Sequence, residues 1–143
     1  WQVIKAESKK NGDMVNSRKI FDDSEAAHPI EEDEFIRIEN IKGKLVMIGA
    51  EDDALWDTAK YIRRAEKRLS EKPHSCNAEF FVYKHGTHYV FPESLLKSIL
   101  PIGGGLFLKL AFKAAKEFPK ECKQTRVDID RNVIRIIKEW KSK

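Results

Sequence analysis

Two short apolar runs on either side of a helical pattern restrict most strongly how this chain can fold. Residues 45–49 are five consecutive apolar residues, with glycine counted, which is typical of a strand buried on both faces of a parallel sheet. Apolar residues then recur three or four positions apart over residues 56–69, which predicts an amphipathic helix that ends near Pro73. Residues 78–84 predict a second strand. The order strand, helix, strand therefore predicts one βαβ unit, a parallel sheet and an α/β fold.

The regions that flank this unit carry weaker patterns. Residues 1–33 are polar and irregular, so we expect loops with at most short helical turns. After the second strand, the pattern predicts a short helix over residues 93–100, a helix over residues 106–118 and a terminal helix that carries the apolar residues of 127–140. With 143 residues and no internal repeat, the chain is expected to form a single domain over residues 1–143.

The charge pattern and the cysteines limit the classes of partner and compartment. The 27 basic residues are interleaved with 23 acidic ones, which is typical of a solvated surface and argues against nucleic-acid binding. Cys76 and Cys122 form no C-x-x-C pair, so a reducing, cytoplasmic compartment is expected. The longest apolar stretch, residues 99–112, is interrupted by Pro101, three glycines and Lys109, so no transmembrane segment is expected.

Acidic residues and histidines follow the two predicted strands. Asp52 and Asp53 come after the first strand, and His85 and His88 come after the second. Because the carboxyl ends of parallel strands meet at one edge of a sheet, an acid and an imidazole are expected there together. A carboxylate that accepts the Nδ1 proton of a histidine fixes its tautomer and stabilises the imidazolium formed in general-base catalysis. The pattern therefore predicts half of a catalytic triad.

The same residues allow two other interpretations. An aspartate at the start of a helix is a favoured N-cap, because its side chain accepts an otherwise free amide proton. The spacing His85-x-x-His88 is one that can bind zinc, but no nearby cysteine or acid completes a set with ligand spacing. Neither a metal nor a cofactor is therefore expected.

The stretches "IENIKGKLVMIGAEDDALW" and "AEFFVYKHGTHYVFP" resemble the C-terminal part of the acyl-CoA thioester hydrolases and the bile acid-CoA:amino acid N-acyltransferases. Those proteins are relatives of dienelactone hydrolase, and they carry G-x-[ED]-D-x-x-W after a strand and a histidine followed by an aromatic residue and proline. The resemblance covers residues 38–92, and the flanks match only in general arrangement. It implies a partial α/β-hydrolase fold of C-terminal parallel strands with flanking helices, and an acyl-CoA or other acyl thioester or ester as substrate.

The resemblance also assigns roles to particular residues. Asp53 matches the triad acid, His88 matches the triad base, and Trp56 matches the family tryptophan at the helix start. The chain departs from the family at Thr87, where a glycine is usual, and at His85, where a small residue is expected. His88 is preferred over His85 because an aromatic residue and a proline follow it. Asp52 is expected to cap the helix or to lie in solvent beside Asp53, pointing away from the imidazole.

The nucleophile of such a triad is missing from this sequence. No serine or cysteine stands in a G-x-[SC]-x-G elbow, the turn that lifts the nucleophile to the top of an α/β-hydrolase sheet. The chain is therefore expected to be the C-terminal part of a longer enzyme, inactive alone, whose nucleophile lies on the missing N-terminal half or on another chain. The expected reaction is hydrolysis of an acyl thioester or its transfer to an amine. A dienelactone-hydrolase-like esterase or peptidase and a non-catalytic binding module derived from the same fold remain alternatives.

Two further expectations concern exposed surface. A sheet of two or three strands should leave an edge unpaired unless another segment covers it. Residues 95–118 are more apolar than a solvated connection needs, so they are expected to form either packed core or a lid over an acyl pocket. Core packing predicts complete burial of Leu106, Phe107 and Leu110.

Overall fold

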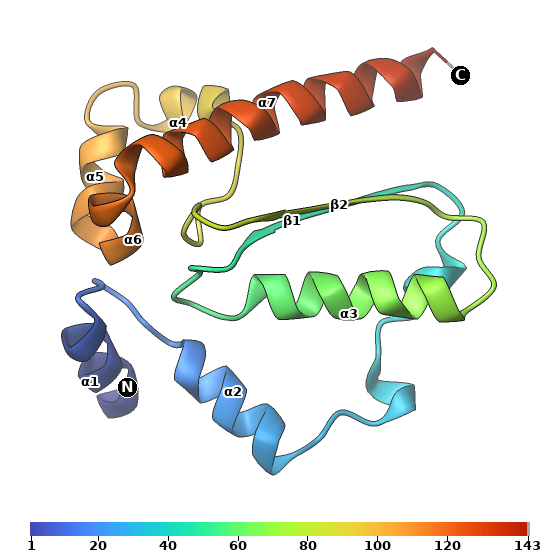
Figure 1. Cartoon of the computed structure of the whole chain (residues 1–143), viewed down its shortest axis with the longest axis horizontal. Helices are drawn as coiled ribbons and strands as arrows, with labels where there is room; N and C mark the ends of the chain where they lie inside the picture. The colour runs from blue at the N-terminus through green and yellow to red at the C-terminus, as the bar shows by residue number, and fades with distance from the viewer. Residues whose placement is uncertain (143) are drawn as a thin grey trace.

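A two-stranded parallel sheet lies at the centre of the protein, with helices on both of its faces (Figure 1). The computed structural model describes residues 1–142. Strand β1 (Lys44–Ala50) pairs with β2 (Asn77–Tyr83) along the full length of both strands. Helix α3 (Thr58–Glu71) connects them. The α/β class, the βαβ unit and the parallel pairing predicted from the sequence are confirmed.

Helix α3 forms because its apolar stripe packs against the sheet and its first turn is capped. Ala59, Ile62 and Leu69 are buried on the face that contacts the strands. The side chain of Asp57 accepts a hydrogen bond of 2.8 Å from the amide of Lys60 and is the N-cap. The helix therefore begins only after a seven-residue loop, residues 51–57, which follows β1.

Helix α7 (Pro119–Lys141) runs along the other side of the sheet from α3 (Figure 1). Its Asp128 accepts a hydrogen bond of 2.7 Å from the hydroxyl of Tyr83 at the end of β2. Its Arg135 pairs with Glu79 on the same strand. These polar contacts join α7 to β2, and the terminal helix predicted from the sequence is confirmed.

The first 33 residues contain more regular structure than their sequence predicts. Helices α1 (Gln2–Asn11) and α2 (Arg18–Ala27) occupy most of this region, so the expectation of loops with short turns was wrong. Neither helix has a broad apolar stripe, and α2 buries none of its residues. Distant backbone groups hold them instead: Met14 N–H donates to the carbonyl of Ala111, and Ser17 N–H donates to that of Ala54. Two short 3₁₀ turns, η1 (Glu32–Glu34) and η2 (Ile38–Asn40), follow.

The region between β2 and α7 holds three short helices. These are α4 (Glu93–Ile99), α5 (Gly104–Ala111) and α6 (Lys113–Glu117). The predicted short helix is confirmed as α4, but the helix predicted over residues 106–118 is divided in two at Phe112, which has an extended backbone. At this break the buried side chain of Phe112 packs against Tyr89, which lies in the loop between β2 and α4, the histidine loop (residues 84–92).

Two further expectations concerned an unpaired edge of the sheet and the burial of the apolar segment that contains α5. Within residues 1–142, β1 and β2 have no strand partner other than each other. Complete burial of α5, which core packing predicts, is contradicted: Leu108 is buried, but Leu106, Phe107 and Leu110 are exposed. No single helix among the described residues has the length and apolar composition to cross a membrane. The bent pair of α4 and α5 has that length and composition only when the two helices are taken together.

Candidate active site

The loops that follow β1 and β2 lie at the same end of the sheet and bring Asp53 and His88 together (Figure 1). The Asp53 oxygens lie 3.0 and 3.2 Å from Nδ1 of His88. The Asp53 side chain is fully buried, whereas 24% of the His88 side chain is exposed. An ionised carboxylate only accepts hydrogen bonds, so this contact assigns the imidazole proton to Nδ1 and leaves the lone pair on Nε2. The arrangement is that of a partly exposed imidazole held in one orientation by a buried carboxylate.

Aromatic rings restrict the His88 imidazole on two sides. The indole of Trp56 packs edge-to-face against it, with ring centroids 4.5 Å apart. Tyr89 packs in the same manner at 5.9 Å. Trp56 itself lies in the loop before α3, two residues ahead of the first helical residue. The rings leave the imidazole few orientations other than the one that faces Asp53.

The expectation that Asp52 caps the helix or lies in solvent was wrong. Asp52 instead binds the histidine loop. Its Oδ1 accepts hydrogen bonds from the backbone amides of Gly86, at 3.0 Å, and Thr87, at 2.8 Å. Its Oδ2 lies 3.1 Å from Nδ1 of His85. Because the loop of residues 51–57 separates Asp52 from α3, the helix end is out of its reach and Asp57 caps the helix instead. Asp52 therefore joins the loop after β1 to the loop after β2.

Thr87 occupies the left-handed backbone region, with φ of 62°. A β-branched residue is strained there, which is why glycine is the usual occupant of such a position. The two amide hydrogen bonds to Asp52 and a 3.1 Å bond from Tyr89 N–H to the Thr87 hydroxyl oppose this strain. The departure from the family pattern at Thr87 is thus accommodated by its immediate neighbours.

His85 has surroundings of its own and does not contact Asp53. Its ring stacks on Phe118, with centroids 3.9 Å apart, and its carbonyl accepts a hydrogen bond from the Thr125 hydroxyl. With Asp52 on Nδ1, His85 forms a second aspartate–histidine pair beside the first. No group of three potential metal ligands is found among residues 1–142.

Arg18 is a site neighbour that the sequence did not indicate. Its guanidinium donates to the carbonyls of Glu51, at 2.8 Å, and Asp53, at 3.3 Å, and it pairs with the side chain of Asp57. Through these contacts Arg18, on α2, fixes the backbone of the loop between β1 and α3, the acid loop (residues 51–57). The residues lie more than 30 positions apart in sequence, and α2 has no pattern that points to them, so no sequence signal could have found this role.

The two cysteines are buried thiols. Burial, and to a smaller extent the nearby Asp52 carboxylate, raises the pKa of the Cys122 thiol to about 11. Cys122 therefore stays protonated at neutral pH, where only a thiolate would be a strong nucleophile. Cys76 packs in an apolar cluster with Ile38 and Leu69.

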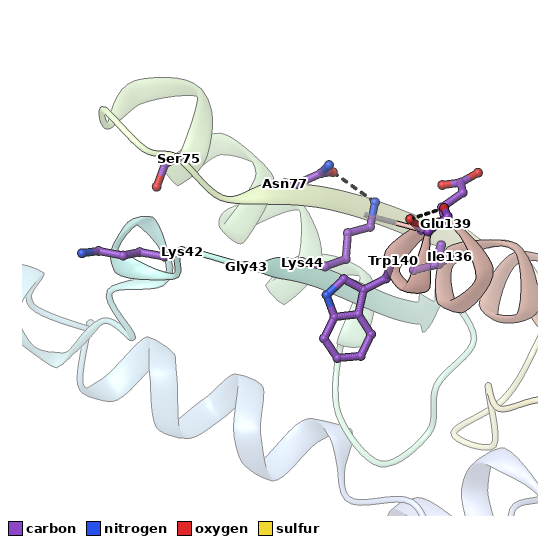
Figure 2. A pocket seen from close by; sticks show the side chains of 9 residues that line it. Lys42, Gly43, Lys44, Ser75, Asn77, Ile136, Glu139 and Trp140 are labelled. Atoms are coloured by element: carbon purple, nitrogen blue, oxygen red, sulfur yellow. Dashed lines mark hydrogen bonds between the residues drawn. The ribbon is translucent and has the colours of Figure 1, made fainter.

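Cavities lie at both ends of the sheet. One of about 290 Å³ adjoins the acid loop and is lined by Asp52, Asp53 and Arg18 among others. Another, of about 500 Å³, lies at the opposite end, where the strands begin; Figure 2 shows Lys44 and Trp140 in its wall. Lys44 there donates to the Asn77 side chain and pairs with Glu79, so its charge is already neutralised. The acid loop and the histidine loop thus border the first cavity and not the second.

Comparison with known proteins identifies the family. No curated protein and no solved structure gave a match. A family model described as "BAAT / Acyl-CoA thioester hydrolase C terminal" matches residues 2–94. The match includes the acid loop and the histidine loop, and it begins well before residue 38, so it also takes in α1 and α2. Because it spans more than half of the sequence, this chain belongs to the BAAT / acyl-CoA thioester hydrolase C-terminal family.

Proposed function

We propose that this chain supplies the acid and the base of a Ser/Cys-His-Asp triad in an acyl-CoA thioester hydrolase or an acyl-CoA:amino acid N-acyltransferase. Asp53 is the acid and His88 is the base. One observation carries the proposal: the buried Asp53 carboxylate lies 3.0 Å from His88 Nδ1, beyond the carboxyl ends of two parallel strands. Family membership supports an acyl thioester as substrate.

The reaction divides into two half-reactions on one histidine. Nε2 of His88 takes the proton from a serine hydroxyl or cysteine thiol as that group attacks the thioester carbonyl. The tetrahedral intermediate then expels coenzyme A as a thiolate, which takes the proton from the imidazolium and leaves as the thiol, and an acyl-enzyme remains. Water or an amine attacks this acyl group, and His88 again accepts and returns the proton. Asp53 stabilises the imidazolium in both halves.

The nucleophile in this proposal comes from outside the 143 residues. Neither cysteine lies in an elbow motif, and Cys122 is protonated by virtue of its burial. A preceding segment, or another chain, would add strands beside β1 or β2, whose outer edges have no strand partner within the described part of the chain. The chain would then be the C-terminal part of an α/β-hydrolase sheet.

Trapping the acyl-enzyme tests this function. The full-length protein is mixed with acyl-CoA thioesters of increasing chain length, quenched within the burst of coenzyme A release and digested for mass spectrometry. We expect one acyl adduct, on a serine or cysteine outside residues 1–143. An adduct on Cys76 or Cys122 would contradict the assignment of the nucleophile. Faster turnover of the matching oxygen esters would indicate an esterase, and the absence of any release would favour a binding module.

Asp52→Ala should loosen the histidine loop. The amides of Gly86 and Thr87 lose their common acceptor, so the free energy of unfolding should fall by about 1–3 kcal/mol. Amide hydrogen exchange at these two residues, measured by NMR, should become faster. Asp130→Ala is the matched control, because it also removes a carboxylate that accepts a backbone amide hydrogen bond, from Ser94, and it should cost about 1 kcal/mol without changing exchange at Gly86 and Thr87. Unchanged exchange in Asp52→Ala would show that the loop holds its shape without this carboxylate.

A further inference from the structure

The turn between α4 and α5 lies at one corner of the molecule (Figure 1). This turn and α5 expose a group of large apolar side chains. Ile102, in the turn itself, is 92% exposed, and on α5 the values are 62% for Leu106 and 71% for Leu110. Leu106 and Leu110 are four residues apart, so they share one face of the helix, with Phe107 beside them. We call the exposed Ile99, Ile102, Leu106, Phe107 and Leu110 the α4–α5 tip.

The sequence segment that carries the tip differs in charge from the rest of the chain. Residues 94–116 contain four lysines and no acidic residue, while the remaining residues contain equal numbers of basic and acidic side chains. The whole net charge of +4 therefore falls in the segment that carries the tip. Lys97 and Lys109 are exposed on the same helices as the apolar residues, and of the four only Lys113 has a recorded ion pair within residues 1–142, with Glu117.

We infer that the α4–α5 tip docks on the surface of an anionic lipid bilayer, with its apolar side chains in the headgroup boundary and its lysines against the headgroups. Protein interfaces are depleted in lysine, whereas segments that lie on membranes combine Leu, Ile or Phe with lysine around them. The aliphatic stem of a lysine can lie along such apolar residues while its ammonium group stays at the headgroups.

The docking surface adjoins the candidate active site. Phe107 of the tip packs against Tyr89, which in turn packs against His88. An acyl chain that leaves the bilayer near the tip would emerge close to this imidazole. The inference itself rests only on the exposure and charge of the tip, so it stands or falls separately from the proposed acyl transfer.

Vesicle binding tests the inference. The full-length protein is sedimented with vesicles of phosphatidylcholine alone and of phosphatidylcholine with 30% phosphatidylserine, and the partition coefficients are compared. We expect binding to the anionic vesicles only. Lys97→Gln/Lys109→Gln should weaken it by roughly twenty-fivefold, at about fivefold for each lysine. Ile102→Ser/Leu106→Ser should weaken it by at least about tenfold.

The controls distinguish vesicle binding through the α4–α5 tip from non-specific hydrophobic binding by other exposed residues. Ile36→Ser changes another strongly exposed isoleucine, 82% exposed against 92% for Ile102. It lies between η1 and η2, far from the tip in sequence, and its substitution should leave binding unchanged. The segment that holds η1 and η2 is the light-blue part of the chain in Figure 1. All the substituted side chains are exposed, so circular dichroism should show no loss of fold. The inference is overturned if neither vesicle binds, if neutral vesicles bind equally, or if the tip variants bind like the unaltered protein. Light scattering that showed a dimer broken by Ile102→Ser would assign the tip to a second copy instead.

Discussion

Replacing His88 with alanine in the full-length protein is expected to lower kcat for acyl thioester turnover by about 10⁴-fold or more. The imidazole is the group that would move the proton in both half-reactions, and within residues 1–142 no other imidazole contacts the Asp53 carboxylate. KM should change little, because the histidine acts on the chemical step and not on binding of the acyl chain. Steady-state assays of coenzyme A release measure both quantities.

Asp53→Asn should cost nearly as much, about 10⁴-fold in kcat, while the shape of the site is kept. An amide on Nδ1 can donate a hydrogen bond, which favours the tautomer with its proton on Nε2, and a base needs the lone pair at that atom. An aspartate that served only as a local cap would tolerate this change, since Asn caps about as well as Asp. The Oδ1 contact with the amide of Leu55, at 2.9 Å, should survive the substitution.

His85→Ala is the matched control for the substitutions of His88 and Asp53. It removes an imidazole three residues away that pairs with Asp52 and stacks on Phe118, so turnover should stay within about tenfold of the unaltered enzyme. A loss in His85→Ala as large as that in His88→Ala would show that the base had been assigned to the wrong histidine. Full activity in both Asp53→Asn and His88→Ala would exclude the triad.

Arg126→Met is expected to lower the free energy of unfolding by about 3–5 kcal/mol. Nε of Arg126 on α7 lies 2.7 Å from Oε2 of Glu93 on α4, and both side chains are almost completely buried. Removing one partner leaves an unpaired carboxylate away from water. Urea denaturation followed by circular dichroism measures the change.

Two comparisons identify the cause of this loss. Arg126→Met/Glu93→Gln removes both charges and should recover a large part of the stability, because no unpaired ion is left buried. Arg131→Met breaks the exposed pair with Asp128 on the same helix and should cost less than about 1 kcal/mol. An equal cost for Arg131→Met and Arg126→Met would mean that burial of the Arg126–Glu93 pair has no particular importance.

The central βαβ unit could be predicted from the sequence because its signals are local. A short continuous apolar run and a 3.6-residue stripe report burial on both faces of a strand and on one face of a helix. Chain order then brings the residues after both strands to one end of the sheet, which is why Asp53 and His88 could be identified as neighbours. The helices α1 and α2 were not predicted because they lack such a stripe. They are held instead by backbone hydrogen bonds to distant segments, such as that from Ser17 N–H to the carbonyl of Ala54, and these leave no periodic pattern in the sequence.

The sequence by itself determined the class of fold, the family motifs and the end of the sheet where the acids and imidazoles gather. Only the tertiary structure decided which aspartate pairs with which histidine. The reason is the loop of residues 51–57, which delays the start of α3 and so keeps both Asp52 and Asp53 away from the helix end. That loop leaves the helix cap to Asp57 and turns Asp52 toward the amides of Gly86 and Thr87, with Asp53 on His88. Adjacent aspartates with identical chemistry differ only in the direction that the folded backbone gives them, and that direction depends on contacts more than 30 residues apart.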